Sequence, residues 1–258
     1  MIAFYTLLKK ESTRFLKVFI QTIFAPMFSS ILYLIIFSQV MQNRFIEQYQ
    51  ISYIMFLIPG LIMMQILQNA FSNPSSSLIQ SKITGSIIFL LLSPISTLEF
   101  FFGYLFAGII RGILVGVSFL IVSIFFLDFA TLQNLMVSIN IFWLFAFMFV
   151  GAALFSVLGI LAGLFSEKYD HITIFNSFII MPLIMLSGVF YTIEMLPSFW
   201  KNLLYFNPIF YLLDGFRYSF FGISKFTPLI SLFSVSIIIF ILSLLTIYLI
   251  KIGWKLKQ

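Results

Sequence analysis

The stretch FTPLISLFSVSIIIFILSLLTIYLI, residues 226–250, contains no charged residue and decides the fold class. A helix needs about 20 apolar residues to cross the hydrocarbon core of a bilayer, and this stretch is long enough. A helix at the surface of a soluble protein shows a polar face every three to four residues, which this stretch lacks. It therefore predicts a transmembrane helix.

Five further stretches are long, apolar and nearly free of charge, one of them with Arg111 in its interior, which gives six predicted spans in total. They are Val18–Asn43, Gln48–Ser81, Phe100–Leu127, Asp128–Ser166 and Ile172–Ile193. Over the whole chain 62% of residues are hydrophobic and 9% are charged, whereas soluble domains carry roughly 25% charged residues. We therefore expect an all-α polytopic membrane protein in which residues 1–258 form a single transmembrane domain.

The composition also excludes several classes of chemistry. The chain has no cysteine, so it can form neither a disulfide nor a thiolate metal site, and its net charge of +6 is too scattered to predict nucleic-acid binding. It lacks a G-x-x-x-x-G-K-[ST] loop, a G-x-S-x-G elbow and an H-E-x-x-H pair. His171 has no second ligand at metal-binding spacing and is interpreted as a solvated loop residue. We predict no catalytic residue, no metal and no cofactor.

The basic residues predict the orientation. Lys and Arg in short loops near the helix ends favour the cytoplasmic side. With six spans both termini share one side, which holds half of the 14 basic residues, namely Lys9, Lys10, Arg14, Lys17, Lys251, Lys255 and Lys257. Lys82 and Lys168 join them, whereas Arg44, Lys201, Arg217 and Lys225 lie on the opposite side. We therefore expect both termini to be cytoplasmic.

Three segments outside the spans have a predicted role. Residues 1–17 alternate apolar and basic side chains, which indicates either a helix in the cytoplasmic membrane interface or a frayed tail with orienting charges. After a polar break at Ser72–Ser77, residues 78–92 form a short apolar segment on the cytoplasmic side. Residues 194–225 combine apolar pieces with helix breakers and fit an external re-entrant segment before the last span.

The third span is predicted to begin with a capping box. Ser96 and Glu99 have the required spacing, in which each side chain bonds the backbone amide of the other. The alternative for Glu99 is a proton or substrate site. Pro59-Gly60 in the second span predicts a kink.

Small residues in two spans indicate close helix packing. Gly108, Gly112 and Gly116 recur every fourth residue in the third span, and Gly159 and Gly163 repeat the spacing in the fourth. Arg111 is an intramembrane charge on the third span. Such a charge either faces protein or water, or else it reaches back to the headgroups.

Three blocks of this sequence resemble the integral-membrane permeases of type-2 ABC exporters. They are FLIPGLIMM (residues 56–64), GSIIFLLLSPIS (residues 85–96, followed by Gly103-Tyr104 and Arg111-Gly112) and PLIMLSGVFYTIEMLPSFWKNLLYFNPIFYLLDGFRYSFFG (residues 182–222). The resemblance covers nearly the full chain. It is greatest to the small six-helix permeases of polysaccharide, nodulation-factor and drug exporters.

The resemblance implies a permease of the bacterial inner membrane with defined partners. Two copies of a cytoplasmic ABC ATPase and a second permease copy, in a homodimer or heterodimer, would complete the transporter. Residues 1–17 would be a cytoplasmic elbow helix and residues 78–92 a coupling helix that docks on the ATPase. The implied contact or orienting residues are Gly85, Ser86, Ile87, Ile88, Leu91 and Leu92.

One departure from the family pattern concerns this coupling segment. Many relatives carry an acidic residue near the position of Ile88 or Phe89, and both are apolar here. Docking through apolar contacts is then expected instead of an ion pair. The alternative is a membrane-surface helix unrelated to any partner.

The alternative function is a secondary carrier or lipid flippase driven by an ion gradient. Such a carrier usually has an intramembrane carboxylate or paired charges. Arg111 alone is weak evidence for a carrier. A polytopic membrane enzyme lacks any polar catalytic cluster in this sequence. The substrate cannot be identified, because the 36 Phe residues also serve as lipid-facing bulk.

Overall fold

A computed structural model of the chain describes residues 2–41, 45–46, 49, 51–127 and 138–255. The first half contains α1 (Ile2–Lys17), η1 (Ile20–Phe24), α2 (Ala25–Val40), β1 (Phe45–Ile46), β2 (Ile51–Ser52), α3 (Tyr53–Ile83), α4 (Ile87–Leu92), α5 (Thr97–Ser123) and η2 (Ile124–Phe126). The second half contains α7 (Ile141–Phe165), α8 (Tyr169–Phe175), η3 (Asn176–Ile180), α9 (Met181–Met185), η4 (Ile193–Met195), α10 (Ser198–Tyr205), α11 (Pro208–Phe221) and α12 (Pro228–Lys251).

The protein is an all-α polytopic membrane protein, as predicted. Within the described residues, five helical stretches are long and apolar enough to cross a membrane, namely 20–40, 53–83, 97–126, 141–165 and 228–251. The sixth, Tyr169–Met185, is shorter. It was expected to extend to Ile193, but Gly188 adopts a φ of +89°, which a continuing right-handed helix does not allow.

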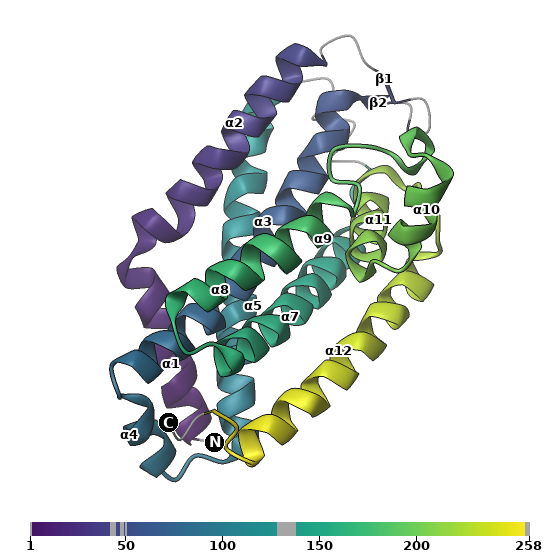
Figure 1. The fold of residues 1–258 in the computed structure, drawn as a ribbon. Coiled ribbons are helices and arrows are strands. Elements are labelled where there is room, and N and C mark those ends of the chain that lie inside the picture. Colours follow the sequence, from purple (N-terminus) through teal and green to yellow (C-terminus); the bar gives the residue numbers. More distant parts are fainter. Residues whose placement is uncertain (1, 42–44, 47–48, 50, 128–137, 256–258) are drawn as a thin grey trace.

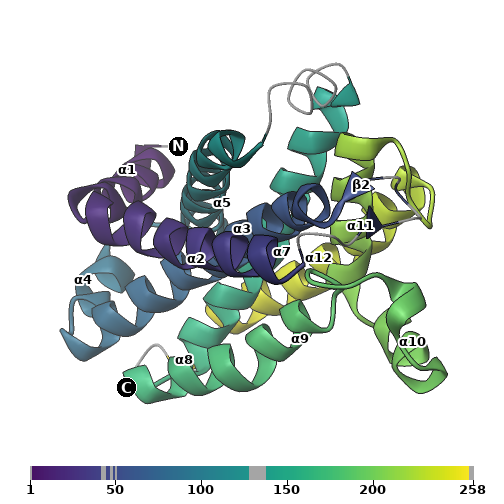
Figure 2. The same ribbon diagram turned by 90° about the horizontal axis from the view of Figure 1, so that it is seen from above.

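Helix α3 lies at the centre of the bundle. Its residues are buried along nearly the whole length, and it packs against α5 and α7 and also contacts α2 and α11 (Figures 1 and 2). The helices α2 and α12 are largely exposed, as expected of surfaces that face lipid. The core of the protein therefore surrounds α3.

The two ends of the bundle are different. The termini and α4 gather at one end, which we call the terminal end, and the two-residue hairpin β1–β2 and α10 lie at the other, the hairpin end (Figure 1). The segment 194–225 folds as η4, α10 and α11, and most of α11 is buried. Arg44, Lys257 and the predicted start of the fourth span at Asp128 lie outside the described residues.

The predicted break at Ser72–Ser77 is wrong, because α3 continues through it to Ile83. Pro74 removes one backbone donor, and the serine hydroxyls bond back within the helix: Ser75 Oγ donates to the Phe71 carbonyl at 2.8 Å, and Ser76 Oγ to the Asn73 carbonyl at 3.1 Å. Three of these polar residues, Asn73, Ser75 and Ser77, are buried in the bundle. The segment 78–92 is consequently divided between the end of α3, a turn and α4.

The helix α1 is a folded element and not a frayed tail. It packs along α5, where Leu7 and Phe15 are almost fully buried. Its exposed face carries Lys9, Lys10 and Lys17. The N-terminal segment is therefore part of the bundle as well as a basic surface.

Candidate functional site

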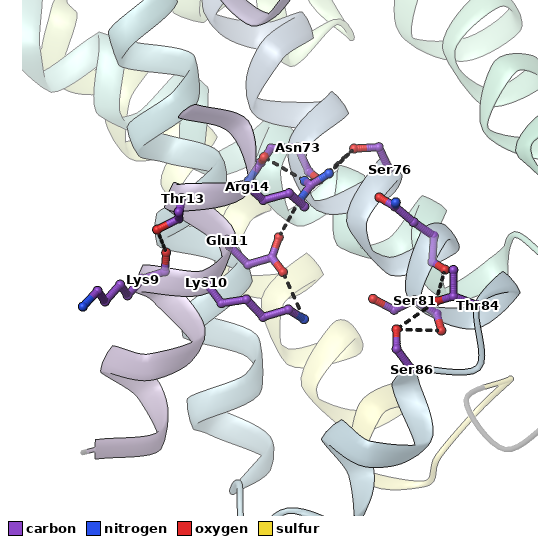
Figure 3. Close-up of polar contacts among 11 residues, drawn as sticks. Lys9, Lys10, Glu11, Thr13, Arg14, Asn73, Ser76, Ser81, Thr84 and Ser86 are labelled. Atoms are coloured by element: carbon purple, nitrogen blue, oxygen red, sulfur yellow. Dashed lines mark hydrogen bonds and ion pairs between the residues drawn. The ribbon is translucent and has the colours of Figure 1, made fainter. Parts of the chain in front are cut away.

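A tight turn connects α3 to α4 at the terminal end. Gly85 has a φ of +71°, the left-handed region that favours glycine. The Thr84 hydroxyl donates to the Gln80 carbonyl at 2.9 Å and lies 2.9 Å from the Ser86 hydroxyl (Figure 3). These contacts fix the direction in which α4 leaves the bundle.

The short helix α4 has one buried and several exposed apolar residues. Ile87 is only 3% exposed and anchors the helix, whereas Phe89 and Leu92 are each 78% exposed. Ile88 and Leu91 are also exposed. We call Ile88, Phe89, Leu91 and Leu92 the α4 patch. An apolar groove of about 480 Å³ lies beside it, between α1 and α4.

A polar stripe runs along α3 at helical spacing. Gln65, Asn69 and Asn73 lie four residues apart on one face, and all three are buried. Gln65 Nε2 donates to Ser30 Oγ on α2 at 2.5 Å, and Asn69 Nδ2 donates to the Gln65 carbonyl at 3.0 Å. One of these bonds joins α3 to α2, and the other stays within α3.

Asn73, the stripe residue nearest the terminal end, binds α1. Arg14 Nη2 donates to Asn73 Oδ1 at 3.0 Å and to the Asn73 carbonyl at 2.8 Å (Figure 3). Arg14 Nε donates to Glu11 Oε2 at 3.2 Å, and the Glu11 side chain is fully buried. Lys10 Nζ lies 3.7 Å from Glu11 Oε1. These contacts make α1 an integral wall of the bundle.

Arg111 on α5 faces Asn69, the middle residue of the stripe. Its Nη2 donates to Asn69 Oδ1 at 3.4 Å, and its buried Nε has no hydrogen-bond partner. Within the described ranges, no carboxylate oxygen lies within 4.0 Å of this guanidinium. Arg111 therefore points towards α3 and carries an uncompensated positive charge.

Arg111 lines a pocket of about 520 Å³, which we call the polar pocket. Its walls come from four parts of the bundle. Neutral amides and hydroxyls supply its other polar residues: Gln21, Ser29, Gln65, Gln68, Asn69, Ser72, Ser75, Ser76, Thr173 and Asn176. The volume is within the range of small-molecule sites.

Two π-helical turns stand at opposite walls of the polar pocket. The turn Ile20–Phe24 supplies Gln21, and the turn Asn176–Ile180 supplies Asn176. Such turns are uncommon and are frequent at functional sites, because they widen a helix and redirect side chains. The pocket therefore lies where two helices depart from regular geometry.

The five packing glycines all face α3. A β-carbon at Gly108 would meet Ser156 of α7 first, with its Cβ at 2.9 Å, and then the Ala70 carbonyl of α3 at 3.0 Å. At Gly112 it would lie 2.9 Å from the Ile66 carbonyl. Gly116 lies against the Ile66 side chain. Gly159 lies against Phe71, and Gly163 against Leu78. Both neighbours of α3 thus approach it through small residues.

The remaining polar candidates take part in local hydrogen bonds. Ser96 and Glu99 form the capping box, in which Glu99 N donates to Ser96 Oγ at 3.2 Å and Ser96 N donates to Glu99 Oε2 at 3.1 Å. His171 Nδ1 accepts from the Glu167 amide at 3.3 Å. In the part of the chain that the structure describes, no group of three or more His, Cys, Asp or Glu residues could hold a metal ion.

Two charged residues at the hairpin end bind backbone groups. Arg217 Nη2 donates to the carbonyls of Gly188 and Val189 at 2.8 and 3.1 Å, where the shorter span ends. The carboxylate of Asp214 accepts from the amides of Lys225 and Phe226, just before α12. Both residues therefore hold helix ends in place.

Sequence reasoning missed several residues of these regions. The interval of four between Gln65, Asn69 and Asn73, inside a stretch without charge, was the available signal for the polar stripe. Phe89 was noted only as a departure from the family pattern, although it is among the most exposed residues of α4. The burial of Glu11 has no local signal in the sequence.

Comparisons with known proteins give a consistent result. The sequence profile described as ABC-2 type transporter matches residues 2–221. The inner membrane transport permease YadH of Escherichia coli K12 is 36% identical over 257 residues, which is 100% of this chain and 95% of the relative. YadH of Shigella flexneri shows the same identity and coverage.

Proposed function

Since the chain belongs to the ABC-2 type transporter family and is a membrane subunit of an ABC transporter, we propose that it is the permease of an ATP-driven exporter. Its energy would come from a separate cytoplasmic ATPase, present in two copies. A second permease copy, identical or related, would complete the membrane part. The permease itself would catalyse no reaction.

The α4 patch carries this proposal. Four exposed apolar side chains stand on a six-residue helix at the end of the bundle where both termini lie. An exposed apolar cluster outside the membrane core is typical of a surface that another protein covers. The patch contains no acidic residue, so the contact with the ATPase would be apolar. Gly85 and Ile87 would orient the helix without touching the partner.

Basic residues at the terminal end indicate how the protein is oriented in the membrane. Lys10 of α1 lines the groove beside α4, Lys9 and Lys17 are exposed on the same helix, and Lys251 ends α12. Short basic segments favour the cytoplasmic side. We assign the terminal end to the cytoplasm of a bacterial inner membrane and the hairpin end to the outside, with segment 194–225 as the re-entrant hairpin.

The polar pocket is our candidate for part of the substrate path. It combines the intramembrane charge Arg111 with neutral amides and hydroxyls, and it opens between α2 and the shorter span 169–185. Polar residues at that depth are costly in lipid and are typical of transport pathways. The pocket is also connected to α4 through α3.

The test is co-purification of the tagged permease from its native membrane in mild detergent. Phe89→Asp and Leu92→Asp should leave the protein inserted but remove a P-loop ATPase that co-purifies with the unaltered chain. Phe89→Leu and Leu92→Met keep the patch apolar and should retain the ATPase. Ile87→Asp is unsuitable, because Ile87 is buried and its replacement disturbs α4 itself.

Two results would count against the proposal. If the ATPase remains bound to both aspartate variants, α4 is not its docking site. If the intact permease never recovers an ATPase, under conditions that preserve known ABC complexes, a carrier driven by an ion gradient becomes the better explanation.

A further inference from the structure

We propose that the polar pocket binds the phosphate or carboxylate group of an anionic amphiphile through Arg111. The inference rests on the proposed function only in treating this molecule as the transported substrate. Its starting point is the guanidinium itself. Arg111 offers five N–H donors, and the described residues supply one acceptor, Asn69 Oδ1, at the long distance of 3.4 Å.

The charge of Arg111 lies deep in the membrane region. It is 12 residues after Glu99 on α5, or about 18 Å along the helix axis. An unpaired charge at such a depth is costly, and a guanidinium is the side chain best suited to planar, bidentate contacts with carboxylate or phosphate. An anion in the pocket would supply the missing partner.

The other polar groups of the pocket suit the same ligand. Gln21 on η1 and Asn176 on η3 offer side-chain N–H donors, and Gln68 on α3 keeps a second N–H beside the one it donates to Met181 Sδ at 3.0 Å. Among the residues that the structure describes, the lining contains no Asp or Glu. The described lining therefore carries a positive charge, which favours an anion.

An apolar groove lies beside the polar pocket and would hold the hydrocarbon part of the ligand. The groove has a volume of about 610 Å³ and is lined by Ile20, Phe24, Met27, Phe28, Ile31 and Val122. Gln21 and Ala25 line both spaces, so the two border the same segment, where η1 passes into α2. A molecule with an anionic head and a hydrocarbon chain can place the head beside Arg111 and the chain in the groove.

The experiment measures binding to the full chain in nanodiscs of neutral phosphatidylcholine. Because the protein has no cysteine, Ile172→Cys gives a single attachment point for an environment-sensitive bimane at the pocket wall. Three probes are titrated: dioctanoyl phosphatidic acid, dioctanoylglycerol without the phosphate, and glycerol phosphate without the chains. We expect dioctanoyl phosphatidic acid to bind most tightly.

Variants identify the groups responsible. Arg111→Gln should weaken binding of dioctanoyl phosphatidic acid at least about tenfold, as expected for loss of a charge-assisted contact, and Arg111→Lys should weaken it less. Asn176→Asp keeps Arg111 but adds a carboxylate to the opposite wall, and it should weaken binding as well. Ser177→Asp adds the same charge at an exposed position that does not line the pocket, and binding should be unchanged.

Three outcomes would overturn the assignment. Unchanged affinity in both Arg111→Gln and Asn176→Asp would exclude an anion site at this pocket. Equal binding of dioctanoylglycerol would show that the negative charge is irrelevant. Equal binding of glycerol phosphate would assign the pocket to a free anion and leave the groove to lipid or a second permease copy. The measurement needs no ATPase, so a failure here is distinct from a failure to recover one.

Discussion

Arg14 of α1 and Asn73 of α3 are joined by two hydrogen bonds, because Arg14 Nη2 donates to the Asn73 side-chain oxygen at 3.0 Å and to its carbonyl at 2.8 Å. The same guanidinium neutralises Glu11, whose side chain is fully buried. A helix that sequence patterns place at the membrane surface is thereby fixed to the centre of the bundle.

Replacing Arg14 should therefore destabilise the protein more than an exposed cation does. Arg14→Met leaves Glu11 buried without its main partner and should lower the free energy of unfolding by about 2–4 kcal/mol. Thermal unfolding in detergent, followed by size-exclusion fluorescence, measures the effect. Lys9→Met serves as the exposed control and should change little.

A double variant separates the charge from the packing. Glu11→Gln combined with Arg14→Met removes both charges and should recover part of the lost stability. If the double variant is as unstable as the sum of the single ones, Glu11 and Arg14 do not act as a pair.

The turn at Gly85 gives a second prediction. Gly85→Ala forces a β-carbon into the left-handed region and should cost about 1–2 kcal/mol locally, which shifts the direction of α4. Gly85→Asn is the matched control, because Asn tolerates this region. In the reconstituted transporter, ATP hydrolysis should become insensitive to the permease for the alanine variant and remain coupled for the asparagine variant. Equal behaviour of the two would exclude the backbone as the cause.

Helix packing against α3 gives a third prediction. Gly112→Val places a branched side chain against the Ile66 carbonyl, where even a β-carbon would lie at 2.9 Å. We expect a loss of about 1–3 kcal/mol from overpacking and a lower melting temperature in detergent. Ile110→Val shortens a neighbouring exposed side chain and is the control. A normal melting temperature for Gly112→Val would show that α5 can move away freely.

The terminal end contains a pair whose contribution depends on pH. Lys255 Nζ donates to Glu167 Oε1 at 2.6 Å, and this ammonium holds the pKa of the Glu167 carboxyl below its ordinary value of 4.5. The stabilisation is therefore complete above pH 4.5 and is lost as the pH falls through the lowered pKa. Hydrogen exchange at Gly253 and Trp254 should rise in that acidic range. Glu167→Gln should remove the dependence, and a persistent dependence would place its origin elsewhere.

Sequence patterns predicted the apolar spans and the capping box at Ser96 and Glu99, because both depend on local spacing. They failed at Ser72–Ser77, where serine and proline are normally helix breakers. There the serine hydroxyls bond to carbonyls of their own helix, and α3 continues.

The candidate site was predictable only in part. The residues of α4 were identified by resemblance, but the division into a buried Ile87 and an exposed Phe89 depends on how Gly85 directs the helix. The charge of Arg111 was evident in the sequence. Its environment was not, because the pocket forms from segments that lie more than 150 residues apart, from Gln21 to Asn176.

The unbroken length of α3 has a mechanical consequence. One helix carries Asn69 beside the pocket and ends two residues before Gly85. A tilt imposed on α4 would therefore tilt α3 and move the residues that α3 contributes to the pocket. The distance between these points is about 24 Å at the usual rise per residue. Pro74 lies between them, and its missing backbone bond makes it the position at which α3 bends at least cost. A stiff α3 would transmit motion between nucleotide and substrate, and a bend at Pro74 would absorb it.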